Sequence, residues 1–174
     1  MKRRIWIIAD THFNHYDLIP DCGRVENFEE LIISGFKKLK DTDILIHLGD
    51  ICLGKDQEVH DSIIKKFQFT KILVRGNHDG KSNNWYLNNG WNFVCEQFKD
   101  TYFGRQILFS HKPVKWEDDY DLNLHGHFHN ISQKYHEKEL VAIKNSYQIL
   151  FALEYLDYQP ILLEDFLRNN NLID

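Results

Sequence analysis

The sequence predicts an α/β fold in which a parallel sheet forms first and a group of further strands follows. Apolar runs alternate with helical patterns as far as Lys81, which is typical of β-α-β units. After Lys81, short strand-like runs follow one another with tight turns. Several of these runs end in Asp, Asn or His, and the carboxyl ends of strands are where open α/β sheets bind ligands.

Size and composition indicate one globular domain spanning residues 1–174. The chain has 43% hydrophobic residues and a mean hydropathy of −0.49, and it shows no repeat or linker. No apolar run approaches the roughly 20 residues of a spanning helix. The N-terminal apolar run is too short for a signal peptide. Three widely spaced cysteines indicate a reducing compartment, so we expect a cytoplasmic protein without a membrane partner.

Three runs of the first half are expected to be strands, and each is followed by polar residues. These are Arg4–Ala9 before Asp10-Thr11-His12, Asp43–Leu48 before Gly49-Asp50, and Lys71–Arg75 before Gly76-Asn77-His78-Asp79. The Asp43–Leu48 run is almost continuously apolar, which suits a strand covered on both faces.

Helices are expected between these strands and at the end of the chain. Asn27 is a good N-cap, and Glu30 three residues later completes a capping-box-like pair. Asp56–Phe67 and Leu163–Asn170 show helical spacing. Pro20 and Gly23 predict a loop over Phe13–Arg24.

The second half is expected to contain mainly strands. Gly104-Arg105 is a plausible hairpin turn between two of them, and Asn83–Gly90 is a short helix or a loop. The expected strands are Phe93–Cys95, Gln97–Phe103, Gln106–Ser110, Leu122–Leu124, Tyr147–Tyr155 and Gln159–Leu162.

Five strand-like runs therefore end in residues that can bind a metal. One Asp-x-His or one Gly-Asp is a weak signal, but five consecutive ends are hard to obtain by chance. Imidazoles with carboxylates and one amide suit divalent transition metals, with manganese first and iron, zinc or nickel as alternatives. An oxygen-only magnesium or calcium site would not need several histidines. The residues are Asp10, His12, Asp50, Asn77, His78, His111, His127 and His129.

The ordered motifs D-x-H, G-D, G-N-H-D, H and G-H-x-H resemble those of the calcineurin-like metallophosphoesterases. The segments DTHFNHYDLI, HLGDI and LHGHFH are similar to the small bacterial and phage members that lack accessory domains. The resemblance implies a four-layer α-β-β-α sandwich, with two mixed β-sheets flanked by helices. It also implies two divalent metal ions and a phosphoric ester hydrolase, either a phosphodiesterase or a phosphatase.

The resemblance also implies a role for each motif residue. One metal would be held by Asp10, His12 and His129, and the other by Asn77, His111 and His127. Asp50 would bridge the two ions, which such centres place roughly 3.5–4 Å apart. Asn77 would also contact the substrate. His78 would protonate the leaving oxygen, and Asp79 would either orient His78 or serve as a turn or cap residue.

The expected reaction is attack of a metal-activated hydroxide on a phosphodiester or phosphomonoester. The formal charge of −5 gives no basic face for duplex nucleic acid. The expected partner is a small phosphate ester, with a nucleotide or short nucleic acid as an alternative. The oligomeric state is left open.

Two other functions remain open. One is a nuclease on single-stranded or short nucleic acid, and the other is a non-catalytic scaffold of the same fold. A protein serine/threonine phosphatase is disfavoured, because the segment GDICLGK lacks that branch's arginine.

Residues outside the motifs have competing interpretations. Arg24 is a candidate to grip a substrate phosphate, against an alternative of a surface salt bridge. Lys112 could do the same or be solvated, while Trp116 and Tyr120 could stack on a base or simply pack. The remaining histidines are expected as buried strand ends (His47 and His125), a loop residue (His15) and surface residues (His60 and His136).

Overall fold

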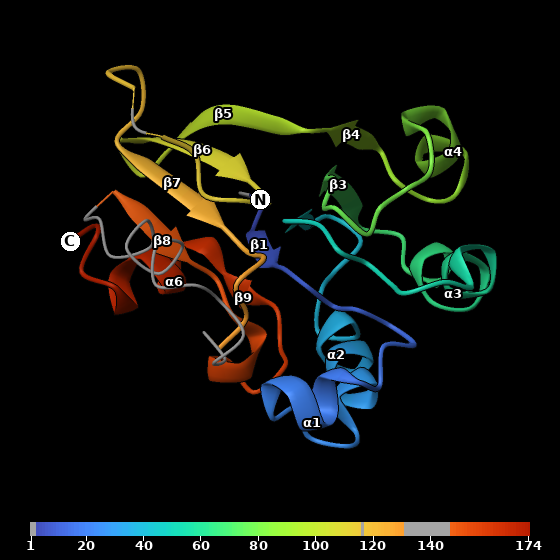
Figure 1. Ribbon diagram of the computed structural model, residues 1–174. Helices are drawn as coiled ribbons and strands as arrows, with labels where there is room; N and C mark the ends of the chain where they lie inside the picture. Colours follow the sequence, from blue (N-terminus) through green and yellow to red (C-terminus); the bar gives the residue numbers. More distant parts are fainter. Residues whose placement is uncertain (1–2, 116, 131–146) are drawn as a thin grey trace.

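The computed structural model describes residues 3–115, 117–130 and 147–174. Its strands form two sheets, one of five strands in the order β4-β3-β2-β1-β9 and one of four in the order β5-β6-β7-β8 (Figure 1).

The first sheet is parallel except at one edge. β1 (Ile5–Ile8), β2 (Ile44–His47), β3 (Thr70–Val74) and β4 (Phe93–Cys95) run parallel, and β9 (Ile161–Leu162) pairs antiparallel with β1. Residues Leu45 to Leu48 are at most 1% exposed, as expected for a strand covered on both faces. The sequence therefore located these strands, including β9 within the expected Gln159–Leu162, while the antiparallel pairing of β9 emerged only in the structure.

The second sheet is also mixed. β5 (Gln97–Tyr102) pairs antiparallel with β6 (Arg105–Ser110), and β7 (Leu122–His125) and β8 (Gln148–Leu150) continue in parallel. The hairpin turn is Phe103-Gly104 rather than Gly104-Arg105. Both turn residues have positive φ, 54° and 76°, which suits the twist of a two-residue hairpin.

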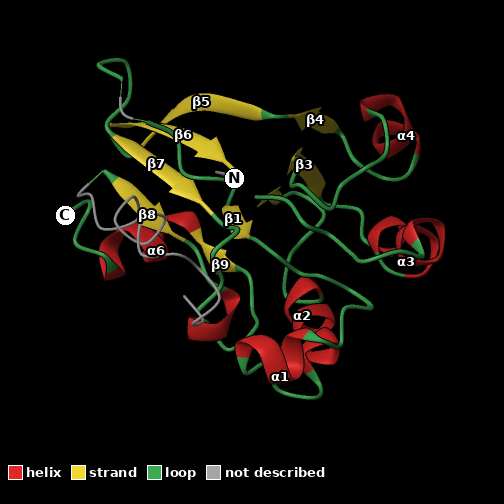
Figure 2. Ribbon diagram, viewed as in Figure 1, coloured by secondary structure: helices red, strands yellow, loops and turns green. Residues whose placement is uncertain are grey.

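Helices flank the sheets (Figure 2). The α-helices in the described ranges are α1 (Leu18–Cys22), α2 (Phe28–Phe36), α3 (Asp56–Ser62), α4 (Asn83–Asn88) and α6 (Leu163–Asn169), and the 3-10 helices are η1 (Ile64–Lys66) and η2 (Leu153–Tyr155). α6 packs against β1 and β9. The predicted class, a mixed α/β fold with two mixed sheets flanked by helices, is confirmed. The single domain stays a prediction.

Three local expectations were wrong. The expected loop Phe13–Arg24 contains α1, which tolerates Pro20 because amide groups in the first helical turn need no intrahelical partner. The expected helix Asp56–Phe67 breaks at Ile63, whose φ and ψ are −122° and −66°. The expected strand Tyr147–Tyr155 ends at Leu150 and is followed by η2.

Asn27 does precede α2, but its side chain makes no capping hydrogen bond. Core residues come from both sheets, so the layers share one apolar interior; fully buried examples are Ile7, Ile46, Phe109, Leu124 and Phe151. In the described ranges, no helix is long and apolar enough to cross a membrane.

Candidate metal centre

The residues expected to bind metal follow the carboxyl ends of β1, β2, β3, β6 and β7. Backbone hydrogen bonds join neighbouring ends: Asp10 N donates to Gly49 O at 2.9 Å, and His12 N donates to Asp50 O at 3.0 Å. In the other sheet, Gly126 N donates to His111 O at 3.0 Å. Polar segments far apart in the sequence therefore meet at one place.

Two groups of ligand-type side chains lie there. Asp10, His12 and His129 form one group, and Asp50, His111 and His127 form the other. Within each group the candidate ligand atoms lie within 4.8 Å of one another. The first group is the set expected for one ion, and the second joins His111 and His127, expected for the other ion, with Asp50, expected to bridge.

Asp50 lies between the two groups. Its Oδ2 atom is 3.4 Å from His12 Nε2 in one group and 3.3 Å from His111 Nε2 in the other. Asn77 Oδ1 is 3.1 Å from the same His111 nitrogen, and His127 Nδ1 is 3.2 Å from it. One carboxylate oxygen therefore lies within 3.4 Å of a histidine nitrogen from each group.

Two of the histidine rings present a nitrogen to this space. His111 Nδ1 is 2.8 Å from Leu48 O, and a carbonyl can only accept, so that nitrogen carries a proton and Nε2 is the nitrogen left to bind a cation. His12 Nε2 is buried without a hydrogen-bond partner among the described residues. A buried imidazole nitrogen without a hydrogen-bond partner, 3.4 Å from a carboxylate oxygen, fits a bound cation.

Burial and charge shift the pKa values at this centre. Burial lowers the pKa of His111, but its hydrogen bond to Asp50 and the charge of Asp10 prevail and raise it to about 9. Burial raises the pKa of Asp10 to about 6. Burial also opposes ionisation of Asp50, but His111 and His12 hold its pKa below the usual range. Without a metal, a proton on His111 thus balances buried carboxylate charge, and a cation would displace it.

The backbone is strained at five of these residues. Asp10, His12, Asp50, His127 and His129 have φ values of 51°, 47°, 57°, 75° and 48°. This left-handed region costs non-glycine residues on the order of 1–3 kcal/mol each and is concentrated at functional sites. The strained turns direct the side chains toward the centre.

Two glycines allow the carboxylates to approach neighbouring loops. A Cβ atom on Gly76 would overlap with Asp50 Oδ1, and one on Gly126 would overlap with Asp10 Oδ2. Both positions thus require the absence of a side chain.

Two further histidines border the centre. His78 has a 36% exposed side chain, and its Nε2 atom is 4.0 Å from Asp50 Oδ2. His15 Nδ1 is 3.2 Å from His12 Nδ1, and the His15 ring centroid is 5.9 Å from that of His78. His15, expected only as a loop residue, thus contacts an expected ligand.

The Asp79 carboxylate accepts hydrogen bonds from backbone N–H groups rather than from the His78 ring. Its carboxylate accepts from the backbone N–H groups of Asp50 at 2.8 Å, Ile51 at 3.0 Å and Gly76 at 2.7 Å. This placement agrees with the turn alternative and not with an orienting contact to His78.

Arg24 is not available to a substrate, so that expectation was wrong. Its side chain has no exposed surface and forms an ion pair with Glu154, Nε to Oε1 at 3.0 Å. It also donates to Thr11 O at 3.1 Å and Asp10 O at 2.6 Å. The pair is buried and not, as the alternative supposed, on the surface.

The other described histidines and aromatic residues that the sequence singled out outside the motifs are mostly buried. His47 and His125 are buried and hydrogen-bonded, as expected. His60 is buried, not exposed, because its ring accepts from Trp91 Nε1 at 3.1 Å. Tyr120 is buried and donates to Lys115 O, so its ring is no stacking platform. Trp116 and His136 lie outside the described residues.

Sequence reasoning missed Glu154, which carries no motif and becomes notable only through Arg24 and His129. Glu154 Oε1 is 3.1 Å from His129 Nδ1. Burial opposes its ionisation, but His129 and Arg24 hold the pKa of Glu154 below its usual range. No signal in the sequence separates it from the other glutamates.

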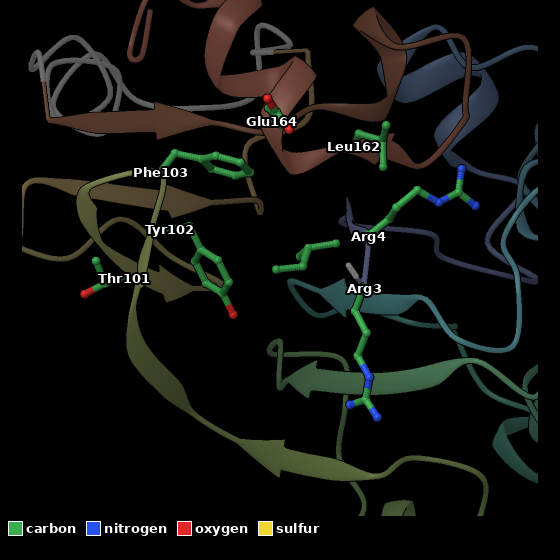
Figure 3. A pocket seen from close by; sticks show the side chains of 8 residues that line it. Arg3, Arg4, Thr101, Tyr102, Phe103, Leu162 and Glu164 are labelled. Carbon is green, nitrogen blue, oxygen red and sulfur yellow. The ribbon is translucent and has the colours of Figure 1, made fainter. Parts of the chain in front are cut away.

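A groove of about 300 Å³ adjoins the centre. It is lined in part by Arg75, Asn77, Gln97, His111 and Lys112. A second cavity, of about 420 Å³, is lined by Arg3, Ile5, Tyr102, Phe103 and Leu162, among others (Figure 3). No residue of the metal centre lines this second cavity.

Known proteins resemble this chain over nearly its whole length. An uncharacterized protein of Methanocaldococcus jannaschii is 28% identical to this chain over an alignment of 174 residues. The alignment covers 93% of this chain and 88% of that protein. The crystal structure of a protein of unknown function from Aquifex aeolicus has a TM-score of 0.75 and 26% identity, covering 97% of this chain and all of that one. The family model of the calcineurin-like phosphoesterases matches residues 3–172. The chain therefore belongs to the calcineurin-like phosphoesterase family.

Proposed function

We propose that this protein is a dinuclear metal-dependent phosphoesterase that hydrolyses a phosphomonoester or phosphodiester. One observation carries the proposal: Asp50 Oδ2 lies 3.3 and 3.4 Å from a histidine nitrogen of each ligand group. A single shared carboxylate is what a pair of closely spaced cations needs.

The chain's own residues supply the remaining functions. Divalent cations held here would provide positive charge at the phosphate and an activated water, with manganese first and iron, zinc or nickel as alternatives. His78 borders the centre from a solvent-exposed position, where it can donate a proton to the leaving oxygen. Asn77 can contact both an ion and the ester.

The adjoining groove supports a small or flexible polar substrate. It is lined by Asn77 and His111 and also by Lys112, whose side chain is exposed. A phosphate at the centre would extend its leaving group or second ester group into this groove, next to the Lys112 ammonium. The proposed partner is therefore a small phosphate ester, including a nucleotide.

The test combines metal analysis with hydrolysis of two model esters. The purified protein is loaded with Mn²⁺ and assayed with p-nitrophenyl phosphate and bis(p-nitrophenyl) phosphate. We expect two ions per chain and turnover that a chelator abolishes. Asp50→Asn should remove activity and lower metal content, whereas Asp165→Asn, at an exposed position in α6, should do neither.

The ratio of the two rates separates a diesterase from a monoesterase. A short single-stranded oligonucleotide, assayed alongside, tests the nuclease alternative. Full activity of the Asp50→Asn protein would contradict the proposal. Two bound ions without turnover on any ester would identify a non-catalytic scaffold instead.

A further inference from the structure

A buried ion pair lies directly behind one half of the metal centre. Arg24 Nε donates to Glu154 Oε1 at 3.0 Å, and the two side chains are 0% and 5% exposed. Glu154 belongs to η2, which follows β8, and Arg24 follows α1. Neither residue belongs to the five strand-end motifs, and the reaction proposed above uses neither.

Arg24 fixes the backbone of the first motif. Its Nη1 donates to Thr11 O at 3.1 Å, and its Nη2 donates to Asp10 O at 2.6 Å. Asp10 and His12 both have φ near +50°, a conformation that persists only where surrounding contacts hold it. Charge-assisted hydrogen bonds to these carbonyls are among the stronger contacts available for that purpose.

Both members of this pair also lie within hydrogen-bond distance of one nitrogen of His129. His129 Nδ1 is 3.1 Å from Glu154 Oε1 and 3.2 Å from Arg24 Nη2. A carboxylate only accepts and a guanidinium only donates, so the two neighbours favour opposite tautomers of the ring. With a proton on Nδ1, the ring donates to Glu154 and Nε2 keeps a lone pair for a cation. With a proton on Nε2, Nδ1 accepts from Arg24 and Nε2 cannot bind metal.

We propose that Arg24 and Glu154 are positioning residues for the ion held by Asp10, His12 and His129. Glu154 selects the metal-binding tautomer of His129, and Arg24 holds the strained turn that presents Asp10 and His12. The inference rests on the proposed metal centre. It assigns the pair to that ion because, in the part of the chain that the structure describes, Arg24 and Glu154 contact Asp10, Thr11 and His129.

If Glu154 positions His129, its replacement should weaken one metal site and not the other. A merely structural role would not make that distinction. A carboxylate behind a ligating histidine typically contributes 10- to 100-fold in metal affinity. In Glu154→Ala, one of the two Mn²⁺ sites should weaken by about that factor, while the other stays unchanged. Glu154→Gln keeps an acceptor without the charge, so its loss at the same site should be smaller.

Glu164→Ala is the matched control, since it removes a glutamate from an exposed pair with Arg168 at 3.2 Å. Titration calorimetry with Mn²⁺ on chelator-treated full-length proteins gives the two affinities. Imidazole ¹⁵N spectra of the metal-free proteins report the tautomer of His129. We expect the Nδ1-protonated form in the wild type and a shift toward the Nε2-protonated form in Glu154→Ala.

Three results would overturn the inference: equal weakening of both sites, wild-type affinities in the folded alanine variant, or an unchanged His129 tautomer. If the alanine variant does not fold, wild-type affinities in Glu154→Gln overturn it. A wild-type protein that binds two ions without hydrolysing esters refutes the proposed function, yet the metal titrations still decide the role of Glu154. A wild type that binds no metal refutes both.

Discussion

The carboxylate of Asp79 holds the loop that presents Asp50. Asp79 Oδ2 accepts from Asp50 N at 2.8 Å, and the same oxygen accepts from Gly76 N at 2.7 Å. In return, Asp50 Oδ1 accepts from His78 N at 2.8 Å. The loops after β2 and β3 are thus tied together from both sides, and each carboxylate depends on the other loop.

Replacing Asp79 by asparagine should therefore destabilise the protein and disturb the metal centre. Asparagine offers one acceptor oxygen, so its amide group would face buried N–H donors, at a cost of about 1–3 kcal/mol. Urea unfolding measures this loss. Asp61→Asn, at an exposed position of α3, should change the free energy of unfolding by less than about 0.5 kcal/mol. Equal stability of the two variants would show that the Asp79 contacts contribute little.

Gly76→Ala should lower metal content and activity. The added Cβ would overlap with Asp50 Oδ1 and push that carboxylate out of position. Gly80→Ala is the control from the same loop, because a Cβ there meets nothing within 4 Å. The measurement is the metal content of both purified variants. Equal metal content in the two would contradict the steric argument.

His78→Gln should lower turnover without releasing metal. The loss should reach about 10²–10⁴-fold for a phenyl ester, whose leaving group needs a proton. It should be much smaller for a p-nitrophenyl ester, because p-nitrophenolate leaves readily unprotonated. Rates for both esters, together with metal content, give the answer. The same loss for both leaving groups would refute a proton-donating role.

The metal-free protein should lose stability as the pH falls, in part through His47. Burial, opposed by Asp50, lowers the pKa of His47 to about 3, against an unfolded value of 6.5. Between these values the unfolded chain binds the proton more tightly, so acid favours unfolding. From pH 7 to pH 5 this one group removes about 2 kcal/mol.

His47→Gln removes that titration while keeping a donor for Thr11 Oγ1, which lies 2.9 Å from His47 Nε2. Its free energy of unfolding should vary less steeply over the same interval, measured by urea unfolding in chelator. Parallel pH profiles of the variant and the wild type would contradict the assignment.

The fold class was predictable because apolar runs and their spacing are local properties of the chain. Ile44–His47 reads as a buried strand before any partner is known, and the polar residues that follow must then lie at a sheet edge. A strand was expected at Gln159–Leu162, and β9 occupies its last two residues. The antiparallel pairing of β9 with Trp6 and Ile7 was not predictable, because it depends on the rest of the fold.

The same distinction applies to the centre. Asp10, Asp50 and the motif histidines could be named because each follows its own strand. His60 was misjudged because its burial depends on Trp91, 31 positions away. Arg24 was misjudged for the same reason, since Glu154 lies 130 positions further along the chain.

The sequence by itself determined which ligand-type residues follow the strands and in what order the strands present them, because strand periodicity and the residue after each strand are encoded locally. Only the tertiary structure decided that the Asp79 carboxylate accepts from backbone N–H groups, and that Arg24 and Glu154 lie behind Asp10 and His129. These relationships are long-range contacts of buried charged groups, and such groups acquire a role only when folding brings an oppositely charged or hydrogen-bonding partner to them.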